Sequence, residues 1–246
     1  LRSLMIDDNT VIQANYYNTN YYKPEYVNEN FDCFVIPLAD AFRENFVNEL
    51  NELTSFVKKL KIPCYVIGVG LKESYEPDFS QPKPQDEAVK KFVTAVLEKS
   101  NCIGVRGELT GKYLETLGFA EGRDFMVIGC PSMYMKGKRL HIQNPKLDVN
   151  SKVCFNSNVA ASVPTRKFIK LKMKEFENHY FIGQVVNELR SIYLGAPYEY
   201  KIEYNFRNVT DKIYQDGRLR FFCNVPKWME FLNDSDLTFG SRLHGN

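Results

Sequence analysis

The sequence lacks the patterns that mark several common classes of protein. Its six cysteines, at positions 33, 64, 102, 130, 154 and 223, form no Cys-x-x-Cys pair, which excludes the usual zinc-binding spacings. No run approaches the ~20 apolar residues of a membrane-spanning helix, and no signal peptide is recognisable. The formal net charge of +2 is too balanced to indicate a nucleic-acid binder.

The composition that is present is typical of a globular protein. Hydrophobic residues make up 44% of the 246 positions and charged residues 25%, which suits one large or two small domains. Aromatic residues are abundant, with 15 Tyr and 18 Phe. Most cysteines stand in apolar runs such as "PCYVIG", so we expect reduced cysteines buried in strands, in a reducing compartment.

Strand and helix patterns alternate along the first half of the chain. Short apolar runs predict strands, and apolar residues at helical spacing predict helices between them. The alternation predicts a parallel, doubly wound sheet. The expected strands are 33–37, 62–70, 101–105 and 124–129, and the expected helices are 39–60, 86–100 and 107–118.

A second alternation follows a linker at 137–151. It predicts a second α/β domain, so we divide the chain into residues 1–145 and residues 146–246. The expected strands of this second domain are 152–156, 179–183, 218–224 and 235–240, and the expected helices are 165–178, which is strongly basic, 184–195 and 225–234.

Polar or flexible residues follow four of the expected strands. In open α/β sheets ligands bind beyond the carboxyl ends of the strands, where the N-termini of the following helices favour anions. Arg242 and His244 would point the same way in an extended segment, because side chains alternate in direction. The residues singled out in this way are Gly70, Arg106, Cys130, Ser132, Ser241, Arg242 and His244.

Each of these residues also has a purely structural interpretation. Arg106 is suitably spaced to pair with Glu108 or Glu115 at the start of its helix. Arg242 would serve equally as an ion-paired surface residue, and His244 as a packed loop residue. Taken alone, the pattern therefore predicts an anion-binding cleft and no particular reaction.

Three segments of the chain stand out together: "CIGVRGELTGKYLETLG", "VIGCPSMYM" and "DLTFGSRLHGN". In this order and with these gaps they resemble the polysaccharide pyruvyl transferase family, and "KLKIPCYVIGVGLK" upstream resembles a further family strand. The resemblance extends from about Asp32 to Asn246. It implies two Rossmann-like domains that face each other across a cleft, as in GT-B glycosyltransferases, with residues 1–145 on the acceptor side.

The resemblance also implies a reaction. The donor would be phosphoenolpyruvate, the acceptor a pair of sugar hydroxyls on a cell-surface polysaccharide precursor, and the product a pyruvate ketal. His244 and Arg106 are then the expected catalytic residues, and Arg106, Arg242 and Ser241 the expected ligands of phosphoenolpyruvate. Arginines bind phosphate and carboxylate groups through paired hydrogen bonds, and histidine titrates near neutral pH. Gly70, Cys130 and Ser132 are expected to line the cleft.

The same resemblance implies the partners and the location. We expect no metal and no cofactor beyond the donor substrate, and no nucleic acid. The acceptor would be a glycan or a lipid-linked oligosaccharide. We therefore expect a cytoplasmic protein, with association at the inner face of the membrane as a further expectation.

The sequence departs from the family in two places. Pro37, Leu38 and Ala39 stand where a glycine-rich turn is usual, and the glycine-rich first strand of the family is missing. We also expect the fold to continue past Asn246 into a helix, so that the second domain is truncated here. These departures leave two alternatives open: a GT-B-type glycosyltransferase that uses a nucleotide sugar, and a non-catalytic relative that binds a glycan or a partner.

Overall fold

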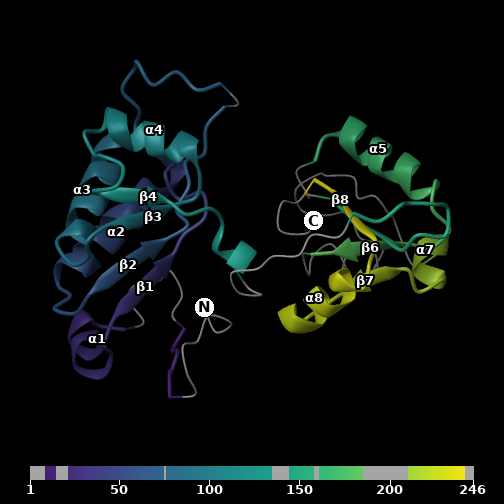
Figure 1. Cartoon of the computed structure of the whole chain (residues 1–246), viewed down its shortest axis with the longest axis horizontal. Helices are drawn as coiled ribbons and strands as arrows, with labels where there is room; N and C mark the ends of the chain where they lie inside the picture. Colours follow the sequence, from purple (N-terminus) through teal and green to yellow (C-terminus); the bar gives the residue numbers. More distant parts are fainter. Residues whose placement is uncertain are drawn as a thin grey trace. The chain divides into compact units, whose positions relative to one another are not determined.

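The computed structural model of the chain describes residues 9–14, 22–74, 76–134, 144–157, 161–184 and 210–241. The chain divides into two compact units, residues 1–141 and residues 142–246. Each unit contains parallel strands with helices packed against them (Figure 1). The mixed α/β fold with parallel sheets that the sequence predicts is thus confirmed, and it is consistent with Rossmann-like domains.

From β1 (Phe34–Pro37) onward the first unit alternates strands and helices in the predicted order, and a helix that was not predicted, α1 (Pro24–Asn30), precedes β1. Its elements are α1 (Pro24–Asn30), β1 (Phe34–Pro37), the 3-10 helix η2 (Glu44–Phe46), α2 (Val47–Lys58), β2 (Cys64–Ile67), α3 (Asp86–Leu97), β3 (Ile103–Val105), α4 (Glu108–Thr116), β4 (Phe125–Val127) and the 3-10 helix η3 (Pro131–Tyr134).

The strands of the first unit pair in chain order. β1 pairs with β2 and β3 pairs with β4, both in parallel. A parallel bridge between Val69 and Val105 joins the two pairs, and the amide of Gly68 donates to the carbonyl of Gly104 at 2.9 Å. The carboxyl ends of all four strands therefore meet along one edge.

The helices of the first unit are stabilised by one buried face each. In α3 the apolar residues recur at helical spacing and are buried, while Asp86 and Glu87 lie in the first turn, where carboxylates complement the helix dipole. α2 packs against α3. α4 ends at Thr116, and Gly118, two residues further on, has a positive φ of 95° that terminates the helix as predicted.

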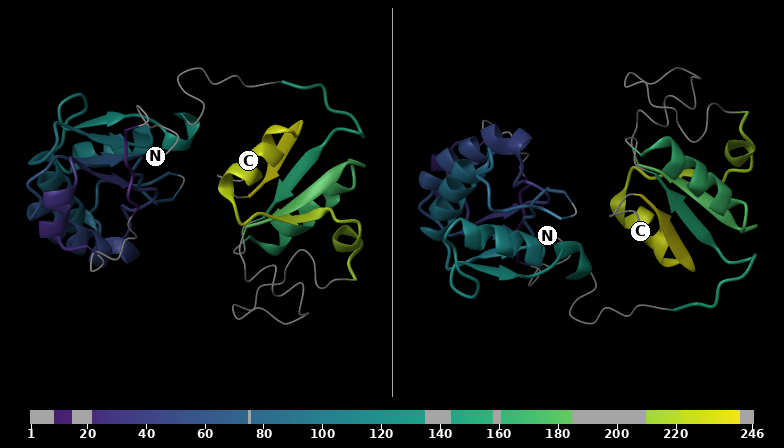
Figure 2. Two further views of the ribbon diagram at one scale, coloured as in Figure 1. Left: turned by 90° about the horizontal axis from the view of Figure 1, so that it is seen from below. Right: turned by 90° about the horizontal axis from the view of Figure 1, so that it is seen from above.

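The second unit has a different strand order. Its elements are β5 (Val153–Asn156), α5 (Val163–Met173), β6 (His179–Gly183), α7 (Lys212–Gln215), β7 (Leu219–Phe221), α8 (Val225–Asn233) and β8 (Leu237–Gly240). The four strands are parallel in the order β7-β6-β5-β8. α5 and α8 lie on opposite sides of this sheet, as Figures 1 and 2 show.

The core of the second unit lies between the sheet and α5. All four residues of β5 are buried, as expected for a central parallel strand, whereas all four residues of β8 are partly exposed. Side-chain capping begins both long helices: Ser162 accepts from the amide of Thr165 before α5, and Asn224 accepts from the amide of Lys227 before α8. The buried apolar residues of this core are Val153, Phe155, Ile169, Met173, Phe181 and Ile213.

Two predicted helices differ from the structure. The helix expected over 39–60 begins at Val47, because Phe42 continues the sheet instead: it forms a parallel bridge with Leu71, and its amide donates to the carbonyl of Gly70 at 3.1 Å. The helix expected over 165–178 spans Val163–Met173. The helix expected over 184–195 lies outside the described residues, apart from Gln184.

The prediction for the cysteines is correct in part. All six are free thiols. Only Cys64 and Cys154 are buried, each within a strand, and burial raises the pKa of Cys64 to about 12. Cys33 and Cys223 are exposed because each stands just outside a strand, in a connecting loop.

Candidate functional site

Arg106 lies where the strands of the first unit end. It follows β3 directly, and its amide donates to the carbonyl of Val69 at 2.8 Å. Its Nε donates to the carbonyl of Gly68 at 2.9 Å, and its Nη2 lies 3.4 Å from the carbonyl oxygen of Leu38. Both carbonyls come one residue after neighbouring strands, so the ends of β1 and β2 orient the guanidinium.

The glycines after β2 make room for this arrangement. A Cβ atom on Gly70 would lie 3.6 Å from both Cβ and Cδ of Arg106 and 3.1 Å from the carbonyl oxygen of Ala39, to which the Gly70 amide donates. Gly68 has a φ of 72°, and a Cβ there would run into the ring of Pro131. The backbone after β2 is therefore packed between Arg106 on one side and the turn after β4 on the other.

The turn after β4 brings Cys130 and Ser132 to the same edge. The Cys130 Sγ and the Ser132 Oγ are 3.0 Å apart. Partial burial opposes ionisation of the thiol, but hydrogen bonds from the hydroxyl and amide of Ser132, with the charge of Arg106, outweigh it and lower the pKa of Cys130. The structure thus brings together Gly70, Arg106, Cys130 and Ser132, which the sequence analysis chose separately.

The departure at Pro37–Ala39 affects this edge through the backbone. Leu38 is buried and contributes its carbonyl to Arg106, and Ala39 contributes its carbonyl to Gly70. Asp40, the next residue, forms an ion pair with Arg43 at 2.6 Å. Main-chain carbonyls make the contacts to Arg106 and Gly70. These contacts are therefore kept although Pro37, Leu38 and Ala39 stand where the family usually has glycines.

Two residues of "RGELTGKY" hold the site in place and were not singled out from the sequence. The hydroxyl of Thr110, on the first turn of α4, accepts from the amide of Leu71 at 3.1 Å. The buried Tyr113 donates its hydroxyl to Asp86 on α3 at 2.7 Å, and burial with this bond raises its pKa. The signal available in the sequence was Thr110, a residue with a hydroxyl group four positions after Arg106. Thr110 therefore ties the helix after Arg106 to the loop after β2, and Tyr113 ties the same helix to α3.

The sheet of the second unit has a reversal of strand order at β5. The chain runs from β5 to β6 to β7 on one side and then returns to β8 on the other. In open α/β sheets such a reversal leaves a crevice at the carboxyl ends of the two strands concerned, where ligands bind. Asn156 ends β5 there and Ser157 follows it, both buried, and Gly240 ends β8.

Gly240 is required by close packing in this place. It is paired with Asn156 in the parallel register of β5 and β8, and a Cβ on Gly240 would run into the carbonyl and the side-chain oxygen of Asn156. Ser241, the next residue, is exposed. Arg242 and His244 lie outside the described residues, so their roles stay predictions.

Arg166 is a further cation near the start of α5. It lies in the first turn of the helix that follows β5, and its Nη1 is buried without a hydrogen-bond partner in the described structure. A buried guanidinium nitrogen in this position is costly unless something accepts its protons. The sequence showed only a basic helix, since Arg166 is one of several cations there and spacing alone does not separate them.

The described ranges hold no group of three or more His, Cys, Asp or Glu side chains arranged to bind a metal ion. Within the same ranges, no helix is long and apolar enough to cross a membrane.

The chain matches the profile of one protein family, "Polysaccharide pyruvyl transferase", over residues 5–246. Comparison with curated proteins and with solved structures returned no match. The matched span contains all of the second unit, all but the first four residues of the first, and every residue discussed above. The chain therefore belongs to the polysaccharide pyruvyl transferase family.

Proposed function

We propose that this protein transfers a pyruvyl group from phosphoenolpyruvate to two hydroxyls of a sugar in a polysaccharide precursor. Family membership supports the transferase class, and the observation that carries the donor assignment is the setting of Arg106. Its guanidinium is held at the carboxyl edge of the first sheet by the carbonyls of Gly68 and Leu38. An oriented guanidinium suits the phosphate or carboxylate group of the donor.

The proposed reaction needs an acid, a base and a place for phosphate. Protonation of the methylene carbon of phosphoenolpyruvate makes C2 electrophilic, and one sugar hydroxyl adds to C2 as its proton is removed. The bond from C2 to the phosphate oxygen then breaks and inorganic phosphate leaves. The second hydroxyl adds to C2, loses its proton and closes the ketal.

We assign the proton-transfer role to His244 and anion binding to Arg106 and Arg242, with Ser241 beside them. Histidine is suited to both proton donation and removal near neutral pH. In this proposal the two units face a shared cleft of the GT-B kind, with Arg106 from the first and the SRLHG residues from the second. Closure of that cleft would exclude water from the reactive C2.

Arg166 joins the proposed site as an additional phosphate ligand. A bound phosphate would accept hydrogen bonds from the buried Nη1, which has no partner within the described ranges. Phosphate at the first turn of α5 would also be favoured by the helix dipole. Arg166→Met should therefore raise the dissociation constant for phosphoenolpyruvate by about tenfold, as expected for one charged hydrogen bond. Lys167→Met, at the exposed neighbour, should leave it unchanged.

The central experiment is calorimetric titration of the full natural protein with phosphoenolpyruvate. Arg106→Ala and Arg242→Ala should each weaken binding by about 1.5–3 kcal/mol. Arg106→Lys should recover only part of the loss, because lysine has no planar fork of donors. Arg123→Ala is the matched control, since Arg123 is exposed and pairs with Asp124 at 2.6 Å. Unchanged binding in both arginine variants would refute the donor assignment.

The same protein separates the remaining alternatives. His244→Ala should reduce turnover much more than binding. A nucleotide sugar that binds where phosphoenolpyruvate does not would favour a glycosyltransferase, since the strand reversal at β5 also suits a nucleotide. Binding of phosphoenolpyruvate without ketal formation on any acceptor would favour a non-catalytic relative.

A further inference from the structure

Helix α5 is basic along its whole length. From Val163 to Lys174 the sequence reads VPTRKFIKLKMK, which contains one arginine, four lysines and no acidic residue. The whole chain has nearly equal numbers of basic and acidic residues, 32 and 30, so this concentration is local. A basic amphipathic helix is typical of a surface that binds acidic partners or membranes.

The orientation of α5 is determined by its buried face. Ile169 and Met173, four residues apart, are buried in the core of the second unit. Residues three and four apart share a face of a helix, so the opposite face points away from the sheet. Exposed residues on α5 are Val163, Pro164, Lys167, Phe168, Lys170 and Leu171, with Lys174 at its end.

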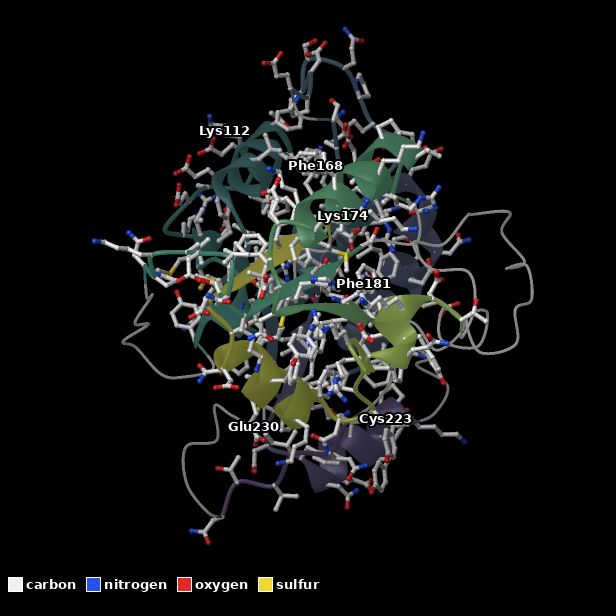
Figure 3. All side chains as sticks on the ribbon, turned by 90° about the vertical axis from the view of Figure 1, so that its right-hand side faces the viewer. Lys112, Phe168, Lys174, Phe181, Cys223 and Glu230 are labelled. Atoms are coloured by element: carbon white, nitrogen blue, oxygen red, sulfur yellow. The ribbon has the colours of Figure 1, made fainter. Side chains whose placement is uncertain are left out.

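Two large apolar side chains stand on the outward face. Phe168 is 48% exposed and Leu171 is 59% exposed, and their spacing of three places them side by side. The ring of Phe168 also packs on Phe239 of β8, with centroids 6.0 Å apart, so it is anchored at one edge. We call Phe168 and Leu171 the α5 ridge. Figure 3 shows Phe168 and Lys174 on this helix.

A row of lysines borders the α5 ridge. Lys167, Lys170 and Lys174 follow a spacing of three and four, so they lie along one flank of the helix, and all three are exposed. On the other flank, Lys172 pairs with Glu175 at 2.9 Å and lies 5.7 Å from the ring of Phe168. Exposed apolar side chains bordered by lysines are the arrangement of helices that lie in the surface of an anionic bilayer.

The helix on the other side of the sheet lacks this arrangement. α8 carries one lysine, Lys227, and one glutamate, Glu230, which pair at 2.8 Å, so it has no row of lysines. The basic, apolar-ridged surface is thus a property of α5 and not of both faces of the second unit.

We propose that α5 docks the protein on an anionic lipid bilayer. The α5 ridge enters the headgroup region, and Lys167, Lys170 and Lys174 contact acidic headgroups. The loop from β5 leads directly into α5, so docking would bring the carboxyl edge of the second sheet close to the bilayer. A lipid-linked acceptor would then bind at this edge, a consequence that rests on the proposed function. The docking itself does not rest on it.

The test is sedimentation of the full protein with phosphatidylcholine vesicles that contain or lack phosphatidylserine. We expect binding only to the anionic vesicles, and weaker binding at high salt. Combined Lys167→Glu, Lys170→Glu and Lys174→Glu should reduce binding by about a hundredfold or more, given roughly fivefold per lysine removed from an anionic surface. Leu171→Gln should reduce it several-fold. Lys227→Glu changes the charge of α8 by as much as one of these three substitutions changes that of α5, and it should have little effect.

Several outcomes would overturn the proposal. These are equal binding to neutral vesicles, no binding to either kind, or an equal loss in Lys227→Glu. A dimer that the α5 variants dissociate, without vesicle binding, would assign the ridge to a second copy of the chain. If another part of the full protein buries Leu171, the α5 ridge would be assigned to an internal contact. Titration with phosphoenolpyruvate in the absence of vesicles is measured in parallel, so failure of docking and failure of the proposed function are distinguished.

Discussion

The two units build parallel sheets in different ways, and the difference affects how each holds its polar residues. In the first unit the strands follow chain order, and the ends of adjacent strands supply carbonyls that orient Arg106. In the second unit the order reverses at β5, and the carboxyl ends of β5 and β8 meet at Asn156 and Gly240. The edge of the first sheet thus presents a side chain held by backbone carbonyls, whereas at the edge of the second sheet two strand ends pack closely together.

The cores of the two units differ as well. The first core draws buried residues from α1, α2, α3, α4 and all four strands. Of the described residues, the second core draws mainly on β5, β6 and α5, and β8 remains partly exposed. The setting of Arg106 is thus supported by a larger buried framework than the setting of Gly240. The predictions below test this contrast, from the largest expected effect to the smallest.

Substitution of Gly68 should give the largest loss of stability. Gly68→Ala introduces a Cβ at a φ of 72° and against the ring of Pro131. We expect a fall in the free energy of unfolding of about 3 kcal/mol, from strain and overpacking together. Urea denaturation followed by circular dichroism measures it.

Gly129→Ala is the matched control for that experiment. Gly129 has a similar φ of 77° but open space around the Cβ position, so only the strain of about 1–2 kcal/mol should appear. Equal losses in the two variants would show that Pro131 moves aside, and that the end of β2 is less tightly packed than the structure indicates.

Gly240→Ala should destabilise the second unit by about 1–3 kcal/mol, because its Cβ meets backbone and side-chain oxygens of Asn156. The chain has a single tryptophan, Trp228 on α8, so its fluorescence reports on the second unit. We expect the fluorescence transition to move in Gly240→Ala but not in Gly68→Ala. A shift of the same transition in both variants would show that the two units unfold together.

Loss of the Thr110 hydroxyl should have a smaller effect. Thr110→Val retains the shape of the side chain but leaves the amide of Leu71 without this acceptor, at a cost of about 1 kcal/mol. Thr110→Ser keeps the hydroxyl and should recover most of the loss. If valine and serine variants unfold at the same urea concentration, the hydrogen bond contributes nothing and packing alone holds the loop.

The smallest effect concerns the thiol of Cys130. Its pKa lies below that of an ordinary thiol, so alkylation by iodoacetamide should reach its plateau at a lower pH. Ser132→Ala and Arg106→Ala each remove a group that stabilises the thiolate, so both should move that midpoint to higher pH. Peptide mapping separates Cys130 from the exposed Cys33 and Cys223. An unchanged midpoint in Ser132→Ala would contradict the role of the 3.0 Å contact.

The sequence predicted most of the elements because hydrophobic periodicity is a local property. The strands 101–105 and 179–183 and the helix at 86–100 agree with the structure to within a few residues. The start of α2 was predicted eight residues early. Phe42 has helical spacing to Phe46, but its amide donates to the carbonyl of Gly70 and its carbonyl accepts from the amide of Lys72. A contact with a segment so distant in the chain leaves no mark on the local pattern.

The candidate site shows the same division. Position after a strand was enough to select Arg106, Cys130 and Ser132, because parallel strands end at one edge wherever they lie in the chain. It did not reveal Thr110 or the buried Nη1 of Arg166, whose significance depends on which atoms lie opposite them.

By itself the sequence determined the alternation of strands and helices, the parallel sheets and the family, since each depends on the order and spacing of residue types. Only the tertiary structure decided that β8 returns to the side of β5 opposite β6, that the carbonyls of Leu38 and Gly68 hold Arg106, and that the α5 ridge faces outward. These outcomes depend on contacts between segments far apart in the chain. Their free energies are set by the packing of the whole unit, which no local pattern encodes.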